Sequence, residues 1–168
     1  MIQRPRRVLF VCTGNIFRSL TAEHALRYAL HGRADIHVSS AGTADYPYLV
    51  RANVREYLLS KGFDVSRHER RTLTEALLKE SHLVIAMSTN HRADLKDRFG
   101  HDAPLFLEAC GEPAEALPDI EEVVLDYQTN RAAVDAHVRA TIDRILALTP
   151  SLAARLDTLL PGLESGRR

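Results

Sequence analysis

The stretch at residues 8–19, VLFVCTGNIFRS, constrains the fold more than any other part of the chain. Its first four residues are β-branched, aliphatic or aromatic, which is typical of a buried strand. A short polar loop follows. Apolar or small residues then recur at the spacing of one helix face, at Ala22, Ala25, Leu26, Ala29 and Leu30. The sequence therefore predicts a strand, a loop and a helix in that order.

The loop between this strand and helix has the composition of an oxyanion-binding site. The first N–H groups of a helix have no partner within the helix, and the helix dipole is positive at that end. Gly14 allows close approach of the backbone, Asn15 tolerates a left-handed conformation, and the planar fork of Arg18 can bind two oxyanion oxygens. We therefore expect a phosphate group to bind the loop residues Thr13, Gly14, Asn15, Ile16, Phe17 and Ser19.

Cys12 opens the same loop and is the candidate nucleophile. A positive field favours the thiolate, which is the reactive form of cysteine. Ser19, at the predicted helix start, can cap the helix or hydrogen-bond the sulfur. The alternative is a buried structural cysteine with a surface arginine nearby. The complete string between a strand and a helix favours the phosphate site.

Length and composition favour a soluble, single-domain protein of a reducing cytoplasm. The 168 residues suit one domain, which we expect to span residues 1–168, with a core at about residues 7–147 and a C-terminal extension at 150–168. The 22 basic and 22 acidic side chains balance, so the charge predicts neither nucleic acid nor an anionic membrane as partner. Two cysteines make no disulfide framework, and no apolar run has the length of a membrane span.

Three further apolar segments predict the rest of a parallel sheet. They lie at residues 35–40, 82–87 and 104–107, and helical patterns separate them. Together with residues 8–11 they predict four parallel strands with right-handed crossovers. A long amphipathic helix follows, which we expect to end near Pro150, with a short extra helix behind it.

The sequence predicts no metal and no cofactor. Cysteines and histidines do not recur at metal-ligand spacing, and His24, His31 and His37 do not form a convincing ligand set.

The string from Cys12 to Ser19 resembles the signature loop of the low-molecular-weight protein tyrosine phosphatases, and the resemblance extends over roughly residues 7–147. Members of that family are metal-free cysteine phosphatases. The resemblance implies an α/β, flavodoxin-like three-layer fold, with a four-stranded parallel sheet and helices on both faces. It also implies that Cys12 attacks phosphorus and that Arg18 stabilises the transition state.

A general acid is also implied, because the leaving phenolate must be protonated. The family supplies an aspartate from a loop before its last helix, often within Pro-Asp-Pro. Leu117-Pro118-Asp119-Ile120 resembles this loop, with Ile120 in place of the second proline. Asp119 is therefore the expected acid. Asp126, which we expect already on the last helix, is the alternative.

By the same resemblance, Ser40 and His68 support the phosphate loop, Cys12–Ser19. Ser40 stands in a Ser-Ala-Gly-Thr string at the end of a predicted strand. An aromatic residue of the family lines the pocket mouth, and Tyr46 is the best match, with Tyr48 as the fallback. Ile16 adds an apolar wall that suits an aromatic ring.

The expected function is hydrolysis of phosphotyrosine in proteins, with a tyrosine kinase as one candidate partner. A non-catalytic phosphoprotein sensor is the alternative from another class, motivated by the altered acid loop. An arsenate reductase would need two further cysteines, and only Cys110 remains. Phosphoarginine hydrolysis is a related possibility, against which Ile16 speaks because a polar residue would better suit a guanidinium.

Overall fold

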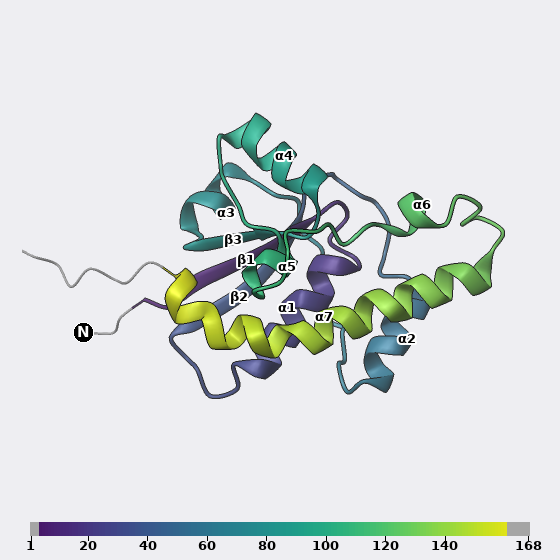
Figure 1. The fold of residues 1–168 in the computed structure, drawn as a ribbon, viewed down its shortest axis with the longest axis horizontal. Coiled ribbons are helices and arrows are strands. Elements are labelled where there is room, and N and C mark those ends of the chain that lie inside the picture. Colours follow the sequence, from purple (N-terminus) through teal and green to yellow (C-terminus); the bar gives the residue numbers. More distant parts are fainter. Residues whose placement is uncertain (1–3, 161–168) are drawn as a thin grey trace, which may run out of the picture.

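A computed structural model describes residues 4–160 (Figure 1). The strands lie in about the first half of the chain with helices between them, and helices alone follow, the last of them long. In chain order the elements are β1 (Arg6–Cys12), α1 (Arg18–Ala29), β2 (Ile36–Gly42), α2 (Ala52–Ser60), α3 (Glu75–Glu80), β3 (Leu83–Ala86), α4 (Thr89–Phe99), α5 (Phe106–Ala109), α6 (Ile120–Val123) and α7 (Arg131–Leu159).

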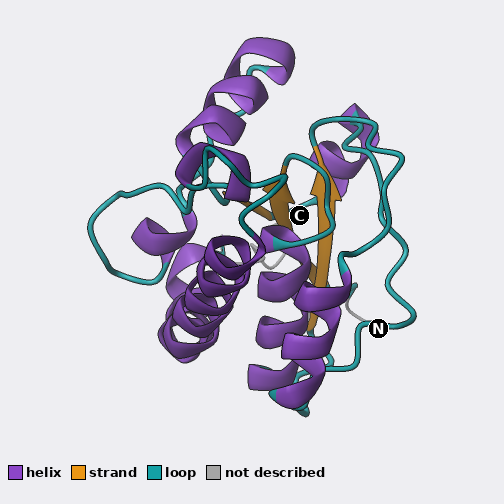
Figure 2. Ribbon diagram, turned by 90° about the vertical axis from the view of Figure 1, so that its right-hand side faces the viewer, coloured by secondary structure: helices purple, strands orange, loops and turns teal. Residues whose placement is uncertain are grey.

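The sheet is parallel, in the order β2-β1-β3. β1 is central, and its alternate residues enter two different cores because successive side chains of a strand point to opposite faces. Val8 and Phe10 pack in one core with residues of α1, α5 and α7. Leu9 and Val11 pack in the other with residues of α3 and α4. The predicted α/β fold, with helices on both faces of a parallel sheet, is confirmed (Figures 1 and 2).

The sheet register places the ends of β1 and β2 side by side, with Cys12 opposite Gly42. Because all three strands are parallel, the loops that follow their carboxyl ends lie together at the same edge of the sheet. Open α/β sheets bind their ligands at this edge.

The predicted fourth strand at residues 104–107 is wrong. The described chain has three strands, and the segment contributes only an isolated bridge between Ala86 and Leu105. Pro104 has no N–H to donate to a ladder. The N–H of Leu105 donates instead to the Glu108 carboxylate at 3.1 Å. This contact caps α5, which begins at Phe106.

The predicted helix end at Pro150 is also wrong, since α7 continues to Leu159. Leu152, Leu156 and Leu160 are almost completely buried in the core beside β1. A proline inside a helix costs about 3 kcal/mol, whereas full burial of one leucine stabilises by about 1.5–3 kcal/mol. Burial of three leucines thus outweighs the proline. Residues 150–159 therefore continue α7 and bury one face against the core, and the rest of the expected C-terminal extension lies outside the described residues.

No helix within residues 4–160 has both the length and the hydropathy needed to cross a membrane.

Candidate active site

The phosphate loop connects β1 to α1, as predicted. Cys12 ends β1 and is 2% exposed, and Arg18 begins α1. Asn15 adopts a left-handed conformation with φ of 56°, in agreement with the expectation for this loop. Gly42 packs directly behind the loop, because a Cβ atom there would lie 2.5 Å from the Thr13 carbonyl oxygen. The neighbouring strand therefore has to present a glycine at this point.

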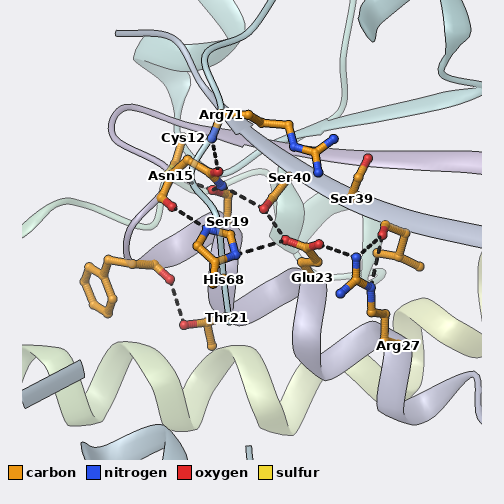
Figure 3. A network of polar contacts seen from close by, with 12 residues as sticks. Cys12, Asn15, Ser19, Thr21, Glu23, Arg27, Ser39, Ser40, His68 and Arg71 are labelled. Atoms are coloured by element: carbon orange, nitrogen blue, oxygen red, sulfur yellow. Dashed lines mark hydrogen bonds and ion pairs between the residues drawn. The ribbon is translucent and has the colours of Figure 1, made fainter. Parts of the chain in front are cut away.

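The side chain of Asn15 holds the loop in shape (Figure 3). Its amide nitrogen donates to the hydroxyls of Ser19 at 3.0 Å and Ser40 at 2.7 Å, and its amide oxygen accepts from the N–H of Arg71 at 3.0 Å. The Ser19 hydroxyl also lies 2.9 Å from the sulfur of Cys12. Because the Ser19 oxygen already accepts from Asn15, its own proton is free to point toward the sulfur. A negative charge on that sulfur would be stabilised.

His68 contacts the loop from outside, as the resemblance implied. Its Nε2–H donates to the carbonyl of Asn15 at 2.9 Å. Burial lowers the pKa of His68 below its usual value, against the opposing effects of the Asn15 carbonyl and of Glu23.

Glu23 is a buried member of this network that the sequence reasoning missed. Its carboxylate accepts from the Ser40 hydroxyl and pairs with Arg27 on the next turn of α1 (Figure 3). Glu23 lies four residues after Ser19, so the two side chains occupy the same side of the helix. That spacing was the available signal.

Arg18 and Asp119 approach one another across 101 residues of sequence. The Nη2 group of Arg18 donates to Oδ2 of Asp119 at 2.7 Å, and Nη1 donates to the carbonyl of Leu117 at 2.9 Å. Asp119 caps the N-terminus of α6 through the N–H of Ile120. The carboxylate of Asp119, at the start of α6, therefore lies beside the guanidinium of Arg18, at the start of α1.

These groups share one pocket. It is lined by Cys12, Thr13, Gly14, Ile16, Phe17, Arg18, Tyr46, Arg51, Asp119, Ile120 and Glu121.

The structure separates the alternatives at the pocket mouth. Tyr46 lines the pocket, whereas Tyr48 is 60% exposed and contacts Tyr46 ring to ring at 4.8 Å. Asp126 does not line the pocket. It lies in the turn before α7, where its carboxylate accepts from Asn130 at 3.1 Å, so the expectation that it stands on the last helix is wrong.

Two more residues brace the loop without having been predicted to do so. Arg70 donates to the carbonyls of Gly14 at 3.2 Å and Ala44 at 3.1 Å. His91 on α4 is 1% exposed, and its Nε2 lies 2.9 Å from the Thr13 hydroxyl. Burial and the nearby Arg18 charge lower the pKa of His91 to about 3. Its imidazole is therefore neutral near pH 7.

This arrangement has the parts of a group-transfer site for an oxyanion. The buried thiol of Cys12, which contacts the Ser19 hydroxyl, can act as nucleophile. The guanidinium of Arg18 can bind the anion, and the carboxyl group of Asp119 can exchange a proton with a leaving group.

Known proteins resemble this chain over most of its length. The family model described as low molecular weight phosphotyrosine protein phosphatase matches residues 7–158. The chain is 30% identical over 144 residues to the probable low molecular weight protein-tyrosine-phosphatase EpsP of Ralstonia solanacearum, covering 85% of this chain and 98% of that protein.

Solved structures give the same fold. The low molecular weight protein tyrosine phosphatase of T. tengcongensis superposes with a TM-score of 0.72 at 26% identity, over 89% of this chain and 99% of that one. The YwlE arginine phosphatase from Geobacillus stearothermophilus superposes with a TM-score of 0.75 at 24% identity, over 98% and 99% of the two chains.

Proposed function

The chain belongs to the low molecular weight phosphotyrosine protein phosphatase family, and on that premise we propose that it hydrolyses phosphotyrosine in proteins through a phosphocysteine intermediate. The observation that carries this proposal is the pocket that Cys12, Arg18 and Asp119 share. The chemistry uses only side chains and backbone of this chain.

In the first step the Cys12 thiolate attacks phosphorus, and the bond from phosphorus to the phenolic oxygen breaks. The Ser19 hydroxyl, 2.9 Å from the sulfur, stabilises the thiolate before attack. Arg18 and the loop amides bind the equatorial oxygens of the transition state. Asp119, in its protonated form, gives its proton to the leaving phenolate, so that a neutral phenol departs.

In the second step water attacks the phosphocysteine. Asp119 is now a carboxylate and takes a proton from the water, and the bond from phosphorus to sulfur breaks. Inorganic phosphate leaves, the thiolate is restored and Asp119 is protonated for the next cycle.

The walls of the pocket support an aryl phosphate as the substrate class. Ile16, Tyr46 and Ile120 line the pocket with apolar and aromatic side chains, which suit a phenyl ring. A thiol that is 2% exposed at the pocket floor favours the long phosphotyrosine side chain over phosphoserine. Proteins that carry phosphotyrosine, including tyrosine kinases that phosphorylate themselves, are therefore the proposed substrates.

The test is hydrolysis of an aryl phosphate and of phosphotyrosine and phosphoarginine peptides at mildly acidic pH, with chelator present. We expect turnover of the first two, loss of turnover in Cys12→Ser and a strong reduction in Asp119→Ala. Retained phosphate binding without turnover in the unmodified chain would establish a sensor instead. A preference for the phosphoarginine peptide would overturn the assignment of substrate class.

A further inference from the structure

Three potential metal ligands meet behind the phosphate loop, outside the catalytic pocket. One ligand atom each from Glu23, His24 and His68 lies within 4.8 Å of the others. Glu23 and His24 are neighbours on α1, while His68 belongs to the segment before α3. The carboxylate of Glu23 and the imidazole of His68 are each 5% exposed, and His24 is half-buried. The fold, and not the sequence spacing, creates this cluster.

The hydrogen bond from His68 to the loop determines which of its nitrogens faces the cluster. Nε2 carries the proton, because it donates to the carbonyl of Asn15 at 2.9 Å. Nδ1 then faces Oε2 of Glu23 at 3.8 Å (Figure 3). In a neutral imidazole this brings a nitrogen lone pair against a carboxylate oxygen. Two such acceptors in a buried place repel one another unless a proton or a metal cation lies between them.

We propose that Glu23, His24 and His68 form a binding site for a divalent late transition-metal ion, with Zn²⁺ as the ion to test. Two imidazole nitrogens and a carboxylate oxygen are ligands that zinc takes readily, with solvent completing the coordination. Ligands at about 2.1 Å from a tetrahedral ion are about 3.4 Å apart. The 3.8 Å pair of His68 and Glu23 therefore needs only a slight contraction. The ligand atom of His24, which lies within 4.8 Å of the other two, has to move closer when the ion binds.

The surroundings of the cluster resemble the outer shell of known metal sites. Metal-binding histidines usually donate their other N–H to a carbonyl or a carboxylate, which fixes the ring. The bond from His68 to Asn15 does so here. Glu23 is likewise oriented by the Ser40 hydroxyl and by Arg27. The positive charge of Arg27 opposes a cation, so the affinity should be lower than in a structural zinc site.

Two ligands of the proposed ion are connected to the phosphate loop. His68 contacts the backbone of Asn15, and Ser40 joins Glu23 to the side chain of Asn15. The ion takes no part in the proposed turnover, which uses Cys12, Arg18 and Asp119. Failure of the metal site would leave the proposed phosphatase activity untouched, and the reverse also holds.

The experiment is calorimetric titration of Zn²⁺ into the full chain carrying Cys12→Ser, which removes the catalytic thiolate as a competing ligand. We expect one ion per chain. Adding His24→Ala should weaken binding by about tenfold or more, since loss of even an outer-shell partner costs that much. Adding His31→Ala, at an exposed histidine elsewhere, should leave the affinity unchanged. Co²⁺ should give the absorption bands of a nitrogen and oxygen site without a sulfur charge-transfer band.

Thermal unfolding of each variant without metal shows whether it is folded, and His24→Gln replaces His24→Ala if the latter is not. The proposal is overturned if the Cys12→Ser chain binds no Zn²⁺. It is equally overturned if the His24 variant binds as tightly as the His31 control.

Discussion

The guanidinium of Arg18 holds the carboxylate of Asp119 at 2.7 Å, Nη2 to Oδ2. The Arg18 side chain is 2% exposed and that of Asp119 is 36% exposed. The residue proposed to bind phosphate thus pairs with the residue proposed to protonate the leaving group. A phosphate dianion in the loop would need the same guanidinium. Substrate binding should therefore release Asp119 from Arg18 and free its carboxyl group for the leaving oxygen.

Removal of this carboxylate should strengthen phosphate binding. In Asp119→Ala the anion no longer competes with an internal partner for Arg18. Because the Asp119 carboxylate is partly open to solvent, we assign the pair the contribution of a surface ion pair, about 0.2–1 kcal/mol. The inhibition constant of inorganic phosphate should therefore fall by up to about fivefold. Competitive inhibition measured on wild type and Asp119→Ala checks this. Weaker inhibition in the variant would show that Asp119 supports anion binding and does not oppose it.

The same variant should be sensitive to the leaving group. Without an acid, expulsion of a basic phenolate becomes difficult, and kcat should fall by about 10²–10⁴-fold for phenols of high pKa. For phenols of low pKa the loss should be much smaller. A series of substituted aryl phosphates measures this dependence. Asp126→Ala, whose residue lies outside the pocket, should behave as wild type. An equal loss for every leaving group would contradict the role of Asp119.

Two substitutions of Asn15 distinguish the effect of its backbone conformation from the effect of its side-chain hydrogen bonds. Asn15→Ala and Asn15→Gly both remove the bonds to Ser19, Ser40 and Arg71, which should lower kcat/KM in both. Alanine, unlike glycine, also has a conformational cost of about 1–2 kcal/mol in the left-handed region. Urea unfolding should therefore find the glycine variant the more stable by roughly that amount. Equal stability of the two would show that the loop relaxes away from φ of 56°.

His91 should make stability fall in acid. Its pKa in the folded protein is about 3, below the value of about 6.5 in the unfolded chain, so the unfolded chain binds the extra proton. The stability that the neutral form of His91 contributes is fully present above about pH 6.5 and is lost as the pH falls toward about 3. By pH 5 the loss reaches about 2 kcal/mol. His24, His37 and His68 contribute in the same direction, because burial lowers the pKa of each.

His91→Gln is the matched variant for this effect, because glutamine can contact Thr13 and does not titrate. The free energy of unfolding, compared at pH 7 and pH 5, should drop less in His91→Gln than in wild type by about 2 kcal/mol. His31→Gln, at an exposed position, should keep the wild-type drop. If His91→Gln shows the same drop as wild type, His91 is protonated in the folded protein.

The part of the site that lies close together in sequence could be predicted well. Cys12, Asn15, Arg18 and Ser19 belong to one strand, loop and helix start, whose local geometry follows from residue type and spacing. Their partners could not be found in this way. Glu23 and His91 look like ordinary helix residues until the sheet brings α1 and α4 against the loop. His68 and Asp119 were recognised through the family resemblance alone.

The errors in the fold have a common physical cause, which is tertiary packing that overrides local propensity. Proline usually ends a helix, yet burial of the leucines beyond Pro150 keeps α7 intact. Leu105 has the apolar neighbours of a strand residue, yet its N–H donates to the Glu108 carboxylate and α5 begins at the next residue. Neither compensation can be read from the segment itself.

The phosphocysteine is the central claim, and trapping it is the most direct test. The chain is mixed with an aryl phosphate, quenched in acid within one turnover and analysed by intact and peptide mass spectrometry. We predict one added phosphoryl group, located on Cys12, that disappears as substrate is exhausted and is absent from Cys12→Ala. Because Asp119 also activates the water, the adduct should persist longer in Asp119→Ala. Turnover without any adduct on Cys12 would contradict the account.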